Sequence, residues 1–378
     1  MRILSLGDIG VADSMMHIGD EAMFEQFVAE MRVRGQSDIV AISSNPAETH
    51  TRYGLTSVPR LSLSGAQAAM IAQAPDAAMA ALDDADAVVI TGAGNLASTW
   101  PVHIIERLEL ARRAAARGIP LVITGQTLGP RLTPDDERLL SELLHTASLV
   151  GVRESASHEL ALRLGVDPAR LRQGADDASF LGLAAGEHPT PEPYVLVSLS
   201  THVGAADRTG FVDSVAALLD ELARVSGIEI VFLAHFGPLA PPWQRGDAVM
   251  HDAVAERMTA PSRIEPTGTA GEAARLARSA SMVVTSRYHP AVFAGPAGVA
   301  TLGIAVDDYT TVKLRGALGA FGQDGVIAAA DLSTAPALAE RLWGARHENR
   351  VRGQVIAAER RAESDAWWDR MVSVFSKA

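Results

Sequence analysis

The chain contains no cysteine among its 378 residues, and this absence removes whole classes of site. Disulfides, thiolate metal sites and cysteine nucleophiles are all excluded. Long apolar runs are also missing. None approaches the ~20 residues of a membrane-spanning helix, and the apolar start at residues 3–6 is too short for a signal peptide. Together these absences predict a cytoplasmic protein.

Positive charge is in short supply as well. Lysine and arginine number 33 against 45 acidic residues, which gives a net charge of −12. This balance argues against a nucleic-acid partner, because phosphate backbones attract basic surfaces. Local arginines can still bind a small anionic substrate. Histidines and carboxylates do not gather at the spacing of a ligand set, so no metal site is expected.

The chain does contain an alternation of strand-like and helix-like segments that runs through it twice. Such alternation predicts an α/β fold with parallel sheets built from right-handed βαβ units. The strands of the first series are expected at residues 3–6, 38–43, 87–91, 120–124 and 148–152, with helices at 20–32, 66–82 and 103–117. Those of the second are expected at residues 194–199, 228–234, 281–285 and 300–304, with helices at 210–225, 248–259 and 272–278.

The length suits two domains, and a proline-rich stretch before residue 194 separates the two series. Two Rossmann-like domains are expected to face each other across a central cleft, bounded by the carboxyl ends of both sheets. An aromatic segment near the end of the chain is expected to cross back and pack on the first domain. The predicted domains are residues 1–183, a linker at 184–193, residues 194–334, and C-terminal helices at 335–378.

The most informative stretch is Ser286-Arg287-Tyr288-His289. It lies between a predicted strand and a small apolar segment suited to a helix, and open α/β sheets bind ligands at the carboxyl ends of their strands. Arg287 would bind an anion there, and His289 would supply a proton, because imidazole titrates near neutral pH.

Other strand-end residues admit two interpretations each. Arg153 follows a strand and suits either a carboxylate or phosphate ligand or a salt bridge with Glu154 or Glu159. Lys313 follows an acidic loop and suits either a phosphate or an exposed helix position. Asp20 suits either a helix N-cap or a carboxylate that accepts a hydroxyl proton.

Four further groups are less specific. His17 lies three residues before Asp20 and either assists it or is merely solvated. Gly92-Ala93-Gly94-Asn95 predicts a tight turn where backbone approaches a ligand, and it lacks the third glycine of a dinucleotide fingerprint. Asp176 and Asp177 are expected to serve as turn or cap residues. His202 and His235 either line the cleft or are structural.

The order of these motifs resembles the polysaccharide pyruvyl transferase family. The resemblance covers roughly residues 1 to 320 and rests on five stretches in sequence. They are Ile18-Gly19-Asp20-Glu21-Ala22, the glycine turn within residues 86–96, Gly125-Gln126-Thr127-Leu128-Gly129-Pro130, Val152-Arg153-Glu154-Ser155-Ala156-Ser157, and Ser286-Arg287-Tyr288-His289.

The resemblance implies a fold similar to the two-domain glycosyltransferases called GT-B. It implies transfer of the pyruvyl group of phosphoenolpyruvate to a saccharide or lipid-linked saccharide, with ketal formation and phosphate release. It also implies roles for matching residues and no cofactor beyond phosphoenolpyruvate as co-substrate. His289 would be the general acid and Asp20 would handle the hydroxyl. The donor would contact Arg287, Arg153, Lys313 and Ser286, and backbone near Gly92, Gly94, Asn95 and Gln126 would hold phosphate or acceptor.

Two other functions stay open at this point. One is a nucleotide-sugar glycosyltransferase of the GT-B type, since a fold does not determine a reaction. The other is a saccharide-binding protein without activity. The acceptor, contact with the inner face of the membrane and assembly into a homo-oligomer also stay open.

Overall fold

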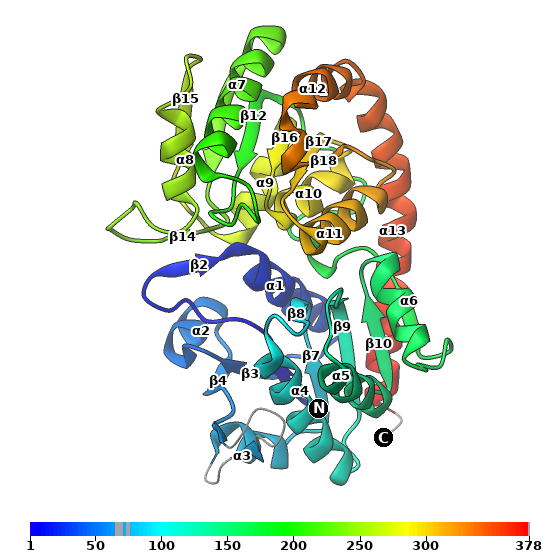
Figure 1. Ribbon diagram of the computed structural model, residues 1–378. Helices are drawn as coiled ribbons and strands as arrows, with labels where there is room; N and C mark the ends of the chain where they lie inside the picture. The colour runs from blue at the N-terminus through cyan, green and yellow to red at the C-terminus, as the bar shows by residue number, and fades with distance from the viewer. Residues whose placement is uncertain (65–70, 73–75, 377–378) are drawn as a thin grey trace. The chain divides into compact units, whose positions relative to one another are not determined.

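The computed structural model describes residues 1–64, 71–72 and 76–376, and the chain divides into two compact units (Figure 1). Unit 1 comprises Met1–Ala12, Met23–Asp177 and Ala362–Ala378, and unit 2 comprises Asp13–Ala22 and Ala178–Arg361. Each unit is built around a parallel sheet. None of the helices in the described ranges has both the length and the apolar character to cross a membrane.

The sheet of unit 1 has the strand order β11-β10-β9-β7-β1-β3-β4, and all its pairings are parallel. Its strands are β1 (Arg2–Leu6), β3 (Asp38–Ser43), β4 (Thr56–Pro59), β7 (Ala87–Ile90), β9 (Leu121–Leu128), β10 (Leu149–Val152) and β11 (Leu171–Gln173). The associated helices are α1 (Ile18–Val33), α2 (Pro46–Tyr53), α3 (Ala77–Asp83), α4 (Pro101–Ala116), α5 (Pro134–Thr146) and α6 (Ser155–Arg163). The order reverses between β1 and β7, which is where such sheets bind ligands.

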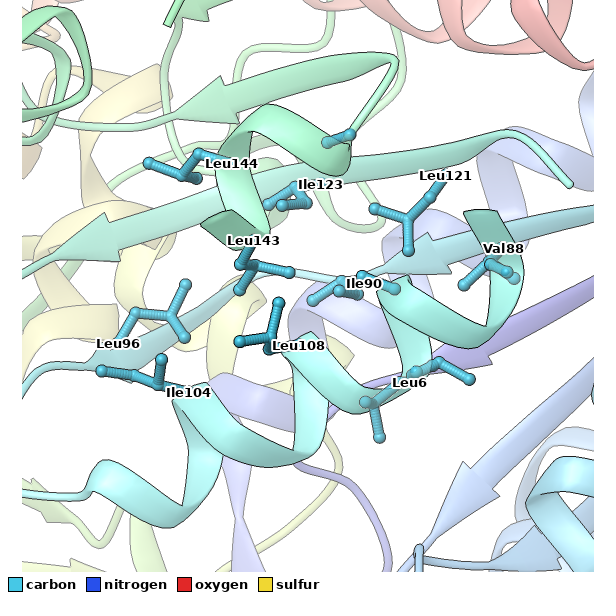
Figure 2. Close-up of a cluster of buried hydrophobic side chains, with 14 of the residues drawn as sticks. Leu6, Val88, Ile90, Leu96, Ile104, Leu108, Leu121, Ile123, Leu143 and Leu144 are labelled. Atoms are coloured by element: carbon cyan, nitrogen blue, oxygen red, sulfur yellow. The ribbon is translucent and has the colours of Figure 1, made fainter. Parts of the chain in front are cut away.

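The central strands β1, β7, β9 and β10 are buried on both faces along nearly their whole length, as is typical of a parallel sheet covered by helices. Figure 2 shows one face, where side chains of β1, β7 and β9 meet α4 and α5. The labelled residues there are Leu6, Val88, Ile90, Leu96, Ile104, Leu108, Leu121, Ile123, Leu143 and Leu144. Ile3, Val89 and Val122 point to the other face and pack with Phe27 of α1.

The end of the chain completes this second face. Helix α13 (Arg346–Phe375) belongs to unit 1 from Ala362 onward. Trp368 is fully buried with its ring 6.5 Å from that of Phe27. Trp367 donates from Nε1 to Thr124 Oγ1 at 2.9 Å. The expected return of the aromatic segment to the first sheet is therefore present.

The sheet of unit 2 has the order β15-β13-β12-β16-β17-β18, again parallel throughout. The order reverses between β12 and β16, so this pair flanks the ligand-binding edge. The strands are β12 (Glu192–Ser198), β13 (Glu229–Leu233), β15 (Ser262–Glu265), β16 (Ala280–Thr285), β17 (Ala300–Ala305) and β18 (Val326–Ala328). The helices are α7 (Arg208–Ser226), α8 (Ala248–Ala255), α9 (Ala270–Ser279), α10 (Tyr288–Ala294), α11 (Asp308–Gly319) and α12 (Ala335–Gly344).

A short segment from the start of the chain also belongs to unit 2. Strand β2 (Met15–His17) pairs antiparallel with β14 (Phe236–Pro238), and Ile18 N donates to His235 O at 3.0 Å. The sequence analysis placed this segment in the first domain, residues 1–183. That placement was wrong, because a strand pairing over more than 200 residues leaves no trace in local periodicity.

The other predicted boundary also differs from the structure. Unit 1 ends at Asp177, and the residues after it, including the predicted linker 184–193, belong to unit 2. Two arginines bind the backbone there. Arg361 donates to Leu183 O at 2.6 Å, just before the predicted linker, and Arg350 donates to Pro189 O at 3.4 Å within it. These bonds hold a stretch whose composition alone is typical of a linker.

Two local predictions need correction. The helix expected at residues 66–82 lies partly outside the described residues. Within them, α3 begins only after the N-cap Asp76, and β6 (Ile71–Ala72) is a strand paired with β5 (Leu63–Ser64). The glycine turn does not lead directly into a helix either. Residues Ala93–Leu96 form β8, which pairs with β9, and α4 starts later.

We expect Trp368→Ala to destabilise unit 1 by about 3–5 kcal/mol, because it removes a large side chain from a packed core and leaves a cavity. Guanidinium unfolding would measure the change. Val355→Ala on the same helix is the matched control, since Val355 is 63% exposed and should change stability by less than about 0.5 kcal/mol. Equal effects of the two substitutions would contradict the packing described for α13.

Candidate functional site

The turn between β16 and α10 is held to the neighbouring strand by its own hydroxyl groups. Thr285 Oγ1 donates to Ser198 O at 2.8 Å and accepts from Arg287 N at 2.9 Å. Ser286 N donates to Ser198 O at 3.0 Å, and Ser286 Oγ accepts from Ser200 N at 2.8 Å. Ser286 is buried, so it shapes the ligand-binding edge between β12 and β16 and presents little of its surface to a ligand.

Arg287 is oriented by a buried carboxylate. Its guanidinium binds Asp247 through two N–H groups, Nε at 2.9 Å from Oδ2 and Nη2 against Oδ1. Asp247 is fully buried and also accepts from His235 N at 3.2 Å and Phe236 N at 2.8 Å. The Nη1 edge of Arg287 makes no hydrogen bond to any described residue, and the side chain is 22% exposed. A bidentate pair of this kind fixes the orientation of the guanidinium, so that its Nη1 group is held in a defined direction.

His289 is buried two residues further on, in the first turn of α10. Its ring contacts Tyr288 edge-on at 5.1 Å and Phe293 at 5.8 Å between centroids. The backbone of Gly19 lies against the same ring, since a Cβ added at Gly19 would stand 2.0 Å from His289 Nδ1. The glycine before Asp20 is therefore required so that the chain can approach the imidazole.

Asp20 lies inside the first turn of α1, which begins at Ile18, so the N-cap interpretation was wrong. Its carboxylate binds His17 Nδ1 at 3.0 Å. Burial disfavours the charged imidazole of His17. The negative charge and the hydrogen bond of Asp20 favour it, and the net effect raises the pKa of His17 above its usual value. Of the two interpretations of His17, the structure therefore favours the one in which it assists Asp20.

Lys313 lies against two tyrosines. Its Nζ stands 4.7 Å from the ring centroids of both Tyr288 and Tyr309 and donates to Tyr309 Oη at 3.1 Å. Tyr288 is adjacent to both Arg287 and His289 in the chain. The lysine predicted from spacing is thus brought to the same turn as the arginine and the histidine.

His235 and His251, both buried in unit 2, are structural. His235 Nδ1 lies 2.9 Å from Ser198 Oγ, and burial lowers its pKa to about 3. His251 Nε2 accepts from Leu199 N at 2.9 Å, and burial lowers its pKa to about 4. Both rings are therefore neutral at physiological pH. His202 is exposed and pairs with Asp307, the N-cap of α11, at 2.9 Å.

In unit 1, Arg153 is buried among carboxylates. Its Nη1 donates to Asp176 Oδ2 at 2.6 Å, and its Nε lies 2.8 Å from Thr127 Oγ1 and 3.2 Å from Glu154 Oε1. All three charged side chains are 1% exposed. The predicted salt bridge with Glu154 is present, and it lies in the interior. Arg153 also binds a second carboxylate, that of Asp176, 23 residues later in the chain.

Asp176 and Asp177 lie at the start of the short 3-10 helix η2 (Asp177–Phe180), as the turn expected there requires, and both side chains are buried. Asp177 Oδ2 accepts from Thr124 Oγ1 at 2.8 Å, and Thr124 in turn accepts from Trp367. Burial, reinforced by the nearby charge of Asp176, raises the pKa of Asp177 to about 7.

The glycine and amide candidates of unit 1 are mostly engaged within the protein. Gly92 packs on Met23, since an added Cβ would stand 2.5 Å from its Sδ. Gln126 is fully buried and donates from Nε2 to Thr91 O at 2.6 Å. Gly94 and Asn95 lie in β8, where Asn95 Nδ2 donates to a carboxylate at 2.7 Å.

That carboxylate belongs to Asp8, which the sequence analysis missed. Asp8 follows β1 and binds Arg107 at 2.7 Å and Arg60 at 3.0 Å. Burial opposes its ionisation, but the two guanidinium groups hold its pKa well below the usual range. His103 lies 3.5 Å away, and burial lowers its pKa. The available signal was a polar residue directly after the first strand, at the point where the strand order reverses.

The unit 2 cluster carries the more reactive chemistry. It combines a cationic edge at Arg287, a lysine on two aromatic rings, a buried imidazole and a histidine–carboxylate pair. At the equivalent edge of the unit 1 sheet, the carboxylate of Asp8 is paired with the guanidinium groups of Arg60 and Arg107. No group of three or more metal-binding side chains occurs in the described ranges, which cover all but eleven positions of the chain.

Stability should depend on pH through Asp177. Its folded pKa lies above the unfolded value, so the unfolded chain loses this proton first as pH rises. The free energy of unfolding should therefore fall between about pH 4 and 7, by up to about 4 kcal/mol. Asp177→Asn should flatten this fall, and Asp135→Asn on an exposed helix end should not. Urea unfolding from pH 4 to 8 measures both, and identical slopes for wild type and Asp177→Asn would contradict the assignment.

Removing the carboxylate of Asp247 should loosen the whole turn. Asp247→Ala leaves two backbone N–H groups in the interior without an acceptor, at a cost of about 1–3 kcal/mol each. Arg287→Ala removes the partner and should cost less, because the guanidinium is partly exposed. Thermal unfolding of both variants tests this order, which fails if Arg287→Ala is the more destabilising.

A family model described as polysaccharide pyruvyl transferase matches residues 17–308, whereas no curated protein matches the chain. Among solved structures, UDP-N-acetylglucosamine 2-epimerase from Rickettsia bellii is similar with a TM-score of 0.58 and 11% identity, covering 99% of this chain and 96% of its own. The UDP-GlcNAc 2-epimerase from Neisseria meningitidis has a TM-score of 0.60 and 10% identity, with both chains fully covered.

The calicheamicin glycosyltransferase CalG4 is also similar, with a TM-score of 0.53 and 15% identity over 99% of this chain and 98% of its own. At these identities the likeness shows the fold alone, a GT-B arrangement of two Rossmann-like domains. The family match covers far more than half of the chain. The protein is therefore a transferase that belongs to the polysaccharide pyruvyl transferase family.

Proposed function

We propose that this enzyme transfers the pyruvyl group of phosphoenolpyruvate to a saccharide or lipid-linked saccharide, forming a ketal and releasing phosphate. The observation that carries the proposal is the turn after β16. In a chain of the pyruvyl transferase family, that turn presents the oriented edge of Arg287 and the ring of His289 at the strand reversal of unit 2.

The donor is a dianionic phosphate next to a carboxylate, so its binding requires cations. Arg287 offers its Nη1 group, while Asp247 binds its Nε and Nη2 groups. Lys313 lies over the ring of Tyr288, the residue that follows Arg287 in the chain. In unit 1, Arg153 keeps a proposed role in anion binding. Its bond with Asp176 is the one that phosphate would compete for. Gly92, Gly94 and Asn95 keep a proposed role beside the acceptor, with Gln126 supporting them through Thr91.

The chemistry follows from general acid–base catalysis. His289 would deliver a proton to the methylene carbon of the donor, and a sugar hydroxyl would attack the central carbon as positive charge develops there. A second hydroxyl would then displace phosphate and close the ketal. The reaction needs no cofactor, because phosphoenolpyruvate is the co-substrate. A lipid-linked acceptor would bring the enzyme to the inner face of the membrane.

Binding and turnover with two donor classes test the proposal. Phosphoenolpyruvate should raise the melting temperature and yield phosphate when saccharide acceptors are present, because ligand binding stabilises the folded state by mass action. UDP-N-acetylglucosamine should do neither. The opposite outcome would favour the glycosyltransferase alternative, for which the similar structures supply the fold but no site residue.

His289→Gln should lower phosphate release by about 10²- to 10⁴-fold, the usual contribution of a general acid, while the melting temperature shift with phosphoenolpyruvate persists. His347→Gln, an exposed position on α13, is the control and should release phosphate at the wild-type rate. Turnover that survives in His289→Gln would remove this residue from the reaction.

A further inference from the structure

We propose that His17 is the base that accepts the proton of the attacking sugar hydroxyl, and that Asp20 is its positioning residue. The inference rests on the proposed function and deepens it. It also divides between two residues the role that the sequence analysis gave to Asp20 alone.

The geometry of the pair carries this division. His17 Nδ1 lies 3.0 Å from Asp20 Oδ2, three residues apart across the start of α1. The imidazole is 49% exposed, whereas the carboxylate is 20% exposed. The ring is thus the member of the pair that a substrate can reach. A carboxylate bound to Nδ1 selects the tautomer whose Nε2 has a lone pair for a proton.

The backbone holds this ring next to the rest of the unit 2 cluster. His17 pairs with Phe236 in the β2–β14 ribbon, and their rings are 5.2 Å apart. Two residues later, Gly19 packs against the imidazole of His289. Residues 17–19 therefore include the exposed imidazole of His17 and contact the buried imidazole of His289 through Gly19. The two imidazoles thus differ in environment, as the acid and the base of one reaction commonly do.

The charges that face His17 favour a base that works near neutral pH. Asp20 on its own segment and Asp247 from across the ribbon stabilise the imidazolium, and Arg287 opposes them. The balance raises the pKa of His17. Because the base must be neutral to accept a proton, activity should fall as pH drops through this raised value.

The protons balance with two imidazoles. His289 gives one proton to the methylene carbon, which becomes the methyl group, and His17 takes one from the first hydroxyl as its oxygen bonds to the central carbon. The second hydroxyl bonds to the same carbon as the bond to the phosphate oxygen breaks, and its proton leaves with phosphate. The proton on His17 then restores His289 through solvent, so no oxidant or further reactant is needed.

The histidine–carboxylate pair can be tested without turnover. NMR titration of the imidazole protons should give His17 a pKa above the usual value for histidine. Asp20→Asn should lower the pKa of His17. A value for His17 that does not respond to Asp20→Asn would overturn the proposed pairing.

Kinetics separate the base from its positioning residue. His17→Asn should lower kcat by about 10²- to 10⁴-fold, with the melting temperature shift by phosphoenolpyruvate intact as evidence of folding and donor binding. Asp20→Asn should keep more activity than His17→Asn and move the acidic limb of the pH profile to lower pH. His347→Asn should match wild type.

Two outcomes would overturn the inference in distinguishable ways. If wild type turns over phosphoenolpyruvate and His17→Asn does so equally well while Asp20→Asn is inactive, Asp20 is the base and the inference alone fails. If wild type releases no phosphate from phosphoenolpyruvate with any saccharide acceptor, the proposed function fails and the catalytic role of His17 fails with it.

Discussion

The organisation of unit 2 depends on the buried carboxylate of Asp247. It accepts both bonds of the Arg287 fork and the N–H groups of His235 and Phe236. One side chain thereby joins the exit of β13, the start of β14 and the turn after β16. A buried charge is tolerated because both carboxylate oxygens accept hydrogen bonds, including a charge-assisted bond from the guanidinium to each. Since β14 also carries β2, the position of His17 depends on the same carboxylate.

The two sheets share a topology but use their reversal points differently. In unit 1 the polar residues after β1 meet in a balanced network, in which Asp8 is shared between Arg60 and Arg107. In unit 2 the equivalent edge keeps exposed chemistry, namely the Nη1 edge of Arg287 and the ring of His17. The same parallel arrangement thus supports a rigid interior in one unit and a candidate reaction centre in the other, because side chains rather than topology determine the function of such an edge.

Much of the fold could be predicted because its signals are local. Apolar runs of four to eight residues marked most strands, and strand-end polar residues marked Arg287, His289 and Arg153. Other features could not be predicted, because they depend on pairing over long distances in sequence. The carboxylate that holds Arg287 lies 40 residues before it, and the one that holds Arg153 lies 23 residues after it. Asp8 was missed because the residues that make it informative are spread over a hundred positions.

The sequence by itself determined the α/β class, the two Rossmann-like sheets, the family and the return of the aromatic C-terminal segment. These follow from periodicity, from motif order and from the need of Trp367 and Trp368 for a buried partner. Only the tertiary structure decided that residues 13–22 join unit 2, that Asp177 is buried with a raised pKa, and that Asp20 pairs with His17. Backbone hydrogen bonding between distant strands and the dielectric environment of a buried carboxylate exist only once the chain is folded.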